Sequence, residues 1–229
     1  MSDTQASLGY GITFEMAPAE TPTLFTYVSE IYDVTPPSDT TDSVDVTHMQ
    51  SPNRTREFIS GLTDPGEMSF EQNYVPGSAS DKALMSAKGK RKWCRITFPN
   101  GVQAMFYAIL QSYEKSAPTD DKMTATVTFK VSGEPILTDP AAPRNLAAPA
   151  VTGVAKVGAP LTIEPGIWAG AMDLTYQWKV DGANIVGSTG QSYIPLIGDI
   201  GKGVSVAVTG ANDAFSTSVT SAETADVVA

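Results

Sequence analysis

The chain has 229 residues, of which 41% are hydrophobic and 17% are charged. This length suits one large domain or two small ones, and the composition supplies a core while excluding a disordered chain. A net charge of −10 argues against a basic footprint for DNA, and one Cys with one His exclude an internal disulfide and the usual zinc sites. Frequent Gly and Pro beside Thr, Ser and Val favour a mainly β fold of short strands and turns.

The first distinctive segment, residues 35–66, is long and irregular. It contains Pro36, Pro37 and Pro52 with several Asp residues, and its strand-like pieces are brief, such as 44–46. Loops of this length are uncommon inside a compact domain. We therefore expect a long loop that is either disordered or ordered by a partner.

A short helix is predicted over residues 80–89. Ser80 is expected to cap the free amides at its start, Asp81 suits the positive end of the helix dipole, and Gly89 suits the exit. No other segment gives a comparable helical signal.

A hairpin follows, with strands at residues 95–98 and 102–107 around Pro99-Asn100-Gly101, because Asn-Gly supplies the positive φ angles of a tight turn. The strand over 102–110 is apolar on both faces, so one face is expected in the core and the other against a second layer or another subunit. Residues 125–131 alternate strictly between apolar and polar, which predicts a half-buried strand.

Prolines divide the chain after residue 140. We predict domains at 1–140 and 150–229, joined by a proline-rich linker at 141–149. Beyond the linker, short alternating segments at 161–163, 174–180 and 204–208 are separated by turns at 165–166, 181–182 and 210–213. Strands at this spacing predict a β-sandwich.

Several motifs of the first domain, taken in order, resemble the tail tube protein of long, non-contractile-tailed, lambda-like bacteriophages. They are Asp33-Val34-Thr35-Pro36-Pro37, Asp45-Val46-Thr47-His48, Gly61-Leu62-Thr63-Asp64-Pro65-Gly66, the short helix after Tyr74-Val75-Pro76-Gly77, Ile96-Thr97-Phe98-Pro99-Asn100-Gly101 with Phe106-Tyr107-Ala108, and Val131-Ser132-Gly133-Glu134-Pro135. The resemblance covers about residues 8–137.

The second domain is similar to the immunoglobulin-like repeats of bacterial and phage surface proteins. The motifs are Val157-Gly158-Ala159-Pro160, Gly166-Ile167-Trp168, Tyr176-Gln177-Trp178-Lys179, Asp181-Gly182, Tyr193-Ile194-Pro195 and Asp199-Ile200-Gly201. Trp178 would be the core tryptophan. The sequence departs from antibody domains, because it lacks a cysteine pair and has Gly203 where a corner tyrosine would be expected. Antigen binding therefore does not carry over.

Together the two resemblances imply a structural virion protein and no enzyme, with no cofactor. The expected fold is a mainly β tail-tube β-sandwich or barrel with one short helix and a long loop, followed by an immunoglobulin-like sandwich on the tube exterior. Family members form sixfold rings that stack into a hollow tube, so the implied location is the virion tail, assembled in the bacterial cytoplasm. The implied partners are further copies of the chain and the tail tip, tape measure and tail terminator proteins, while DNA passes through the lumen without specific binding.

Two groups of charged residues are candidates for contacts between subunits, with a solvated loop as the alternative for each. The loop candidates, for contacts between rings or subunits, are Asp39, Asp42, Asp45, His48, Arg54 and Arg56, and the basic cluster comprises Lys88, Lys90, Arg91, Lys92 and Arg95. The basic cluster is expected to face the acidic loop of an adjacent subunit, with direct DNA contact as the less favoured reading. Cys94 is expected to be a buried, inert thiol.

A second function class stays open. Trp168 lies in a Gly-rich turn and is expected to be an exposed ring, on which the apolar face of a sugar could stack as a weak contact with the host surface. The alternative to a tube protein is therefore a glycan-binding adhesin module carried by the second domain. Truncation near Pro140 discriminates the two, because tube formation would survive it and binding to cells would not.

Overall fold

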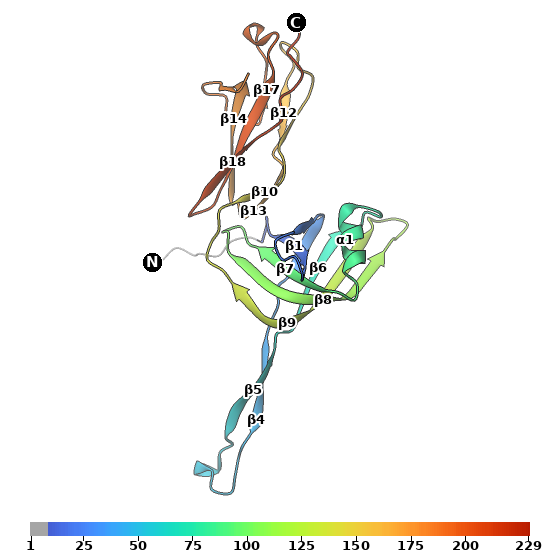
Figure 1. Ribbon diagram of the computed structural model, residues 1–229, viewed down its shortest axis with the longest axis vertical. Helices are drawn as coiled ribbons and strands as arrows, with labels where there is room; N and C mark the ends of the chain where they lie inside the picture. Colours follow the sequence, from blue (N-terminus) through green and yellow to red (C-terminus); the bar gives the residue numbers. More distant parts are fainter. Residues whose placement is uncertain (1–8) are drawn as a thin grey trace. The chain divides into compact units, whose positions relative to one another are not determined.

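The computed structural model describes residues 9–229, which divide into two compact units (Figure 1). The rolled unit comprises Phe14–Ile96 and Ala104–Leu137. The C-terminal unit comprises Thr138–Ala229 together with Thr97–Gln103 and the described residues before Phe14. The chain is mainly β, as predicted. No helix within residues 9–229 is long and apolar enough to cross a membrane.

The rolled unit is built on one seven-stranded sheet with the order β2-β1-β7-β8-β9-β6-β3. Its strands are β1 (Thr13–Pro18), β2 (Thr26–Val28), β3 (Ile31–Thr35), β6 (Glu67–Asn73), β7 (Arg91–Thr97), β8 (Gln103–Ser116) and β9 (Thr124–Leu137). The two edge strands, β2 and β3, are separated along the chain by Ser29 and Glu30 alone. The sheet must therefore curl until its first and last strands approach each other.

Aromatic contacts confirm the curling. Phe14 on β1 and Phe70 on β6 have ring centroids 5.1 Å apart, although three strands separate them in the sheet. In a flat sheet this separation would be roughly 19 Å, at about 4.8 Å per strand. Phe129 on β9 completes the cluster, 5.7 Å from Phe14 and 6.4 Å from Phe70. The three rings are almost fully buried and form the centre of the core.

Helix α1 (Ala79–Ala87) overlaps the predicted range and begins one residue before it, because Ser78 caps the helix and Ser80 does not. The Ser78 hydroxyl accepts a hydrogen bond from the amide of Asp81 at 3.1 Å. Ser80 is buried instead, and its hydroxyl accepts a hydrogen bond from the amide of Ser29 at 2.9 Å. Gly89 follows the helix with φ +69°, in agreement with its expected role at the exit.

Strands β7 and β8 form the predicted hairpin, with a different turn. Gly101 has φ +85°, whereas Asn100 does not have a positive φ. The amide of Gly101 bonds the carbonyl of Phe98 and the amide of Phe98 bonds the carbonyl of Val102, both at 2.9 Å. These bonds define a three-residue loop in which glycine alone takes the left-handed conformation.

Residues 35–66 are not an irregular loop, which corrects the prediction. They contain a long two-stranded hairpin of β4 (Thr40–Asp45) and β5 (Phe58–Asp64), with a short 3₁₀ turn η1 (Pro52–Arg54) near its tip. The hairpin is a sheet of its own and projects away from the seven-stranded sheet (Figure 1). The sequence did not predict these two strands, because neither face of the hairpin is buried. Its residues therefore need not alternate between apolar and polar, and prolines lie on both sides of β4.

The C-terminal unit contains a three-stranded sheet, β11-β12-β16, and a four-stranded sheet, β15-β14-β17-β18, with β10 paired to β13. The strands are β10 (Arg144–Ala147), β11 (Ala150–Thr152), β12 (Leu161–Glu164), β13 (Ile167–Ala169), β14 (Asp173–Val180), β15 (Ala183–Asn184), β16 (Ser192–Tyr193), β17 (Val204–Ala211) and β18 (Ser216–Thr220), with a 3₁₀ turn η2 at Ile197–Asp199. The three predicted strand segments coincide with β12, β14 and β17. Both main sheets contribute to one core around Trp178, which is fully buried.

Strand β10 lies inside the segment that we predicted to be a linker. Arg144 pairs with Ala169, and Asn145 pairs with Trp168. Pro143 and Pro149 flank the strand and do not interrupt it, so the prolines are compatible with pairing at an edge.

Candidate assembly surfaces

Five of the six loop candidates lie on the β4–β5 hairpin and Asp39 directly precedes it, and no residue of the hairpin is buried. No residue of either strand is buried, and the exposed apolar side chains include Val44, Phe58, Ile59 and Leu62. A two-stranded ribbon of this kind is marginally stable alone. Such a ribbon gains a buried face when another surface covers it.

A β-bulge near the middle of the hairpin makes Leu62 prominent. Thr41 pairs with Thr63, whereas Ser43 pairs with Ser60, so Asp42 stands opposite both Gly61 and Leu62. Bulges re-aim side chains. Leu62 is 86% exposed, and the neighbouring carboxylate of Asp42 makes no hydrogen bond or ion pair with any residue in 9–229. The bulge thus presents an apolar group beside an unpaired acid.

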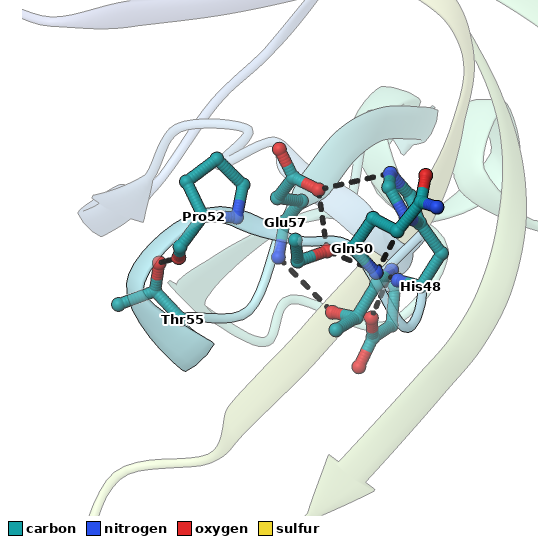
Figure 2. A network of polar contacts seen from close by, with 8 residues as sticks. His48, Gln50, Pro52, Thr55 and Glu57 are labelled. Atoms are coloured by element: carbon teal, nitrogen blue, oxygen red, sulfur yellow. Dashed lines mark hydrogen bonds and ion pairs between the residues drawn. The ribbon is translucent and has the colours of Figure 1, made fainter.

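The tip of the hairpin is ordered by its own polar network (Figure 2). Glu57 is central: its carboxylate accepts a hydrogen bond from the Ser51 hydroxyl at 2.6 Å and lies 3.6 Å from Nε2 of His48. Nδ1 of His48 accepts a hydrogen bond from the amide of Gln50 at 3.1 Å. The hydroxyl of Thr55 donates to the carbonyl of Pro52 at 2.6 Å. The tip therefore has a defined shape without a partner.

Charged candidates on the same hairpin pair with each other. Asp45 lies 3.9 Å from a guanidinium nitrogen of Arg56. Its carboxylate also accepts a hydrogen bond from the amide of Thr47 at 2.9 Å, and hydrogen bonds from Thr47 lower the pKa of Asp45. Arg54 is exposed with φ +57°, next to Asn53 with φ +53°. Asp39, before β4, is exposed as well.

The base of the hairpin is anchored to the rolled sheet. Nζ of Lys130 on β9 lies 2.9 Å from the carboxylate of Asp64, which also accepts a hydrogen bond from the amide of Gly66 at 2.9 Å. The Gly66 bond and then the Lys130 contact lower the pKa of Asp64. Gly66 has φ +73°, and a Cβ there would overlap the carbonyl oxygen of Ser38. Glycine is therefore required where the hairpin leaves the sheet.

The predicted basic cluster is not one surface. Strand β7 alternates, so Lys92 points to the buried side with Cys94, while Arg91 and Arg95 point to the opposite side. Arg95 forms a bidentate pair with Glu15 on β1, at 2.9 and 3.1 Å, and stacks over Phe25. With side-chain exposures of 13% and 3%, this pair holds β1 to β7 within one subunit. Arg91 keeps an exposed position.

An aromatic stack that the sequence analysis missed lies on the outer face of β7 and β8. The rings of Trp93 and Tyr107 have centroids 4.3 Å apart, and the guanidinium carbon of Arg91 lies 4.0 Å above the Tyr107 ring. Met105 and Ile109 flank the stack on β8, and Ile109 is 43% exposed. The surplus apolar face expected for residues 102–110 is this surface, which we call the stacked patch. In the sequence, the alternating positions 91, 93 and 95 indicate that Arg91 and Trp93 share one face of this strand.

Trp168 is not an exposed ring, which corrects the prediction of a glycan platform. The residue is 7% exposed, and its Nε1 donates a hydrogen bond to the carbonyl of Pro165 at 2.9 Å. Its ring packs against Gly210 on β17, where an added Cβ would lie 2.8 Å from the indole. The missing side chain at Gly210 provides the space for the ring, so neither face is free for a sugar.

The one cysteine and the carboxylate groups of residues 9–229 were candidates for a reactive thiol and a metal site. Cys94 is fully buried, and burial raises the pKa of its thiol far above the ordinary value. Among residues 9–229, no group of three or more His, Cys, Asp or Glu side chains could hold a metal ion.

Comparison with known proteins identifies the family of the segment that contains the rolled unit. Residues 12–138, more than half of the chain, match the sequence profile described as lambda phage tail tube protein, TTP. A search of curated proteins gave no significant match.

Solved structures to which the chain is similar include the tail of an empty gene transfer agent particle with C6 symmetry (14% identity, TM-score 0.49, covering 58% of this chain and 100% of that one). The SPP1 tail tube matches with 13% identity and a TM-score of 0.45, covering 57% of this chain and 77% of that one. A sheath/tube terminator of an extracellular contractile injection system matches with 9% identity and a TM-score of 0.48, covering 60% of this chain and 100% of that one. The family assignment rests on the sequence profile.

Proposed function

The chain belongs to the lambda phage tail tube protein family, and from this premise we propose that its copies form hexameric rings that stack through the β4–β5 hairpin into the hollow tube of a virion tail. Members of the family are structural proteins and not enzymes. The genome would pass through the lumen without specific binding, in keeping with the net charge of −10.

The observation that carries this proposal is a long hairpin that is exposed throughout and yet ordered at both ends. Its base is anchored by Asp64 and Lys130, and its tip by the network around Glu57. An isolated ribbon gains nothing from exposed Phe58, Ile59 and Leu62, whereas a ribbon that packs on a neighbouring ring buries them. A preformed tip also lowers the entropy cost of that contact.

The C-terminal unit would decorate the tube exterior as an immunoglobulin-like domain. Its strands can be assigned in chain order as A (β11), B (β12), C (β14), C′ (β15), E (β16), F (β17) and G (β18), which gives the sheets ABE and C′CFG. Trp178 on strand C is fully buried at the centre of the core. The hydroxyl of Tyr193 donates to Asp199 at 2.7 Å and ties strand E to the turn before strand F. These features support the assignment in the absence of a disulfide.

Shortening the hairpin tests the function. We expect that replacing residues 46–57 by Asn-Gly leaves the rolled unit as stable as before, because the segment has no buried residue. The variant should nevertheless fail to form tubes by sedimentation and negative-stain microscopy. The matched control replaces another exposed connection, residues 117–123 between β8 and β9, in the same way. Tubes from the shortened variant at the wild-type concentration would contradict the proposal.

An adhesin role for the C-terminal unit is the second candidate, and it loses its main support with the burial of Trp168. Binding of the purified chain to host cells that is retained by the isolated C-terminal unit would revive it.

A further inference from the structure

The outer face of the rolled sheet carries a set of residues with the composition of a protein-binding hot spot. Trp, Tyr, Arg and Met are the residue types enriched at such sites. The stacked patch brings together Arg91, Trp93, Met105 and Tyr107 with the exposed Ile109. The described part of the chain leaves Ile109 43% exposed, although this face of β8 is apolar over several residues.

We infer that the stacked patch receives the β4–β5 hairpin of a second copy of this chain. This inference rests on the proposed function and names the partner surface of the hairpin. Leu62 and its apolar neighbours would lie on the Trp93–Tyr107 rings, and the carboxylate of Asp42 would reach Arg91.

Charge and shape on the two surfaces support this pairing. The bulge holds the 86% exposed Leu62 next to Asp42, whose carboxylate has no partner within residues 9–229. On the patch, the guanidinium of Arg91 rests on the Tyr107 ring, and no carboxylate of the described chain lies within ion-pair distance of it. Each surface thus offers an apolar group beside one unpaired charge, and the two charges are opposite.

Other features of the chain argue against different occupants. A nucleic acid would need several phosphate contacts, but Arg95 is held by Glu15, Lys92 points to the buried side of β7, and the net charge is −10. Within the described part of the rolled unit, the hairpin is a long exposed element that places apolar side chains such as Leu62 beside an acid, Asp42, with no hydrogen bond or ion pair.

Charge reversal tests the contact. Arg91→Glu and Asp42→Arg should each raise the protein concentration needed for tube formation by about tenfold or more, because like charges would then face each other. The double variant should assemble close to the wild-type concentration, since the pair is restored in the opposite sense. Lys82→Glu is the matched control, because Lys82 is exposed on α1 and belongs to neither surface.

A second measurement does not depend on the effect of the charge changes. Leu62→Cys and Ile109→Cys in one chain should give covalent multimers on oxidation of assembled tubes, and Cys94 stays out of the reaction because it is buried. Each single-cysteine variant should give none. Tubes from Arg91→Glu at the wild-type concentration, together with no multimers from the double-cysteine chain, would overturn the inference and leave the proposed function intact. Failure of the wild-type chain to form tubes would contradict the proposed function, and this inference with it.

Discussion

The glycine at the base of the hairpin offers a quantitative test of how the hairpin is held. We predict that Gly66→Ala destabilises the rolled unit strongly, because the substitution carries two costs. A non-glycine residue in the left-handed region costs about 1–2 kcal/mol. The new Cβ would also overlap the carbonyl oxygen of Ser38, so the backbone must move.

The movement would break the bonds that Gly66 makes with its neighbours. Its amide donates to the carboxylate of Asp64 at 2.9 Å, and its carbonyl accepts from the amide of Val131 at 3.1 Å. At about 1 kcal/mol for each lost bond, the total loss is about 3–4 kcal/mol. The hairpin would leave the sheet in a new direction, so tube formation should fail as well.

Gly77→Ala is the control that carries only the cost of a non-glycine residue in the left-handed region. Gly77 has φ +76°, close to that of Gly66, but nothing lies within 4 Å of an added Cβ. We expect a loss of about 1–2 kcal/mol and normal tubes. Urea unfolding of both variants, followed through the transition of the rolled unit, measures the difference. Equal destabilisation of the two variants would refute the argument that the path of the chain at Gly66 is sterically required.

Four further outcomes are expected. Trp178→Ala should destabilise the C-terminal unit by about 3–5 kcal/mol in calorimetry while tubes still form, because its indole is fully buried in that unit. Glu15→Leu should cost about 3–5 kcal/mol in urea unfolding, since it leaves the buried charge of Arg95 unpaired, and adding Arg95→Met should recover part of the loss. The hydrogen bond from the Gly77 amide is the main cause that lowers the pKa of Asp81 from 3.8 in the folded state. The Asp81 carboxylate therefore stabilises the fold above pH 3.8, and this stabilisation is lost as the pH falls through the lower folded pKa. Asp81→Asn should therefore flatten the acid limb of the stability curve below about pH 4. Cys94 should not react with a thiol reagent until the chain unfolds, because burial keeps it protonated.

The sequence predicts elements well where apolar periodicity and turn chemistry agree. Strand β9 follows strict alternation, and the Asp181-Gly182 turn has positive φ at both residues, as a two-residue hairpin requires. For the strand and the turn, the deciding information lies within about ten residues of the element. The position of Trp178 in the core is also correct, but it follows from the resemblance to immunoglobulin-like repeats and not from a local pattern.

The wrong predictions for single residues concern side chains whose contacts lie far away in the sequence. Ser80 is predicted to cap the helix, but its hydroxyl accepts a hydrogen bond from the amide of Ser29, and Ser78 is the capping residue. Trp168 looked exposed in its Gly-rich turn, yet Gly210, more than forty residues away, makes room for its ring. No local pattern reports such contacts.

Assembly surfaces are harder still, because the residues that form them have no partner inside one chain. The β4–β5 hairpin lacks an apolar face that its own subunit buries, so its strands gave no periodic signal. The basic cluster was grouped by sequence proximity, whereas the alternation of β7 sends Lys92 to one side and Arg91 to the other. The resemblance to a family, and not periodicity, identified the segment as functional.

Electron microscopy of the purified chain at high concentration tests the central claim most directly. We predict hollow tubes built of stacked sixfold rings, in which the hairpin of each subunit lies against the β7–β8 face of a subunit in the next ring. A chain that stays monomeric at every concentration, or tubes in which the hairpin extends freely into solvent, would contradict it.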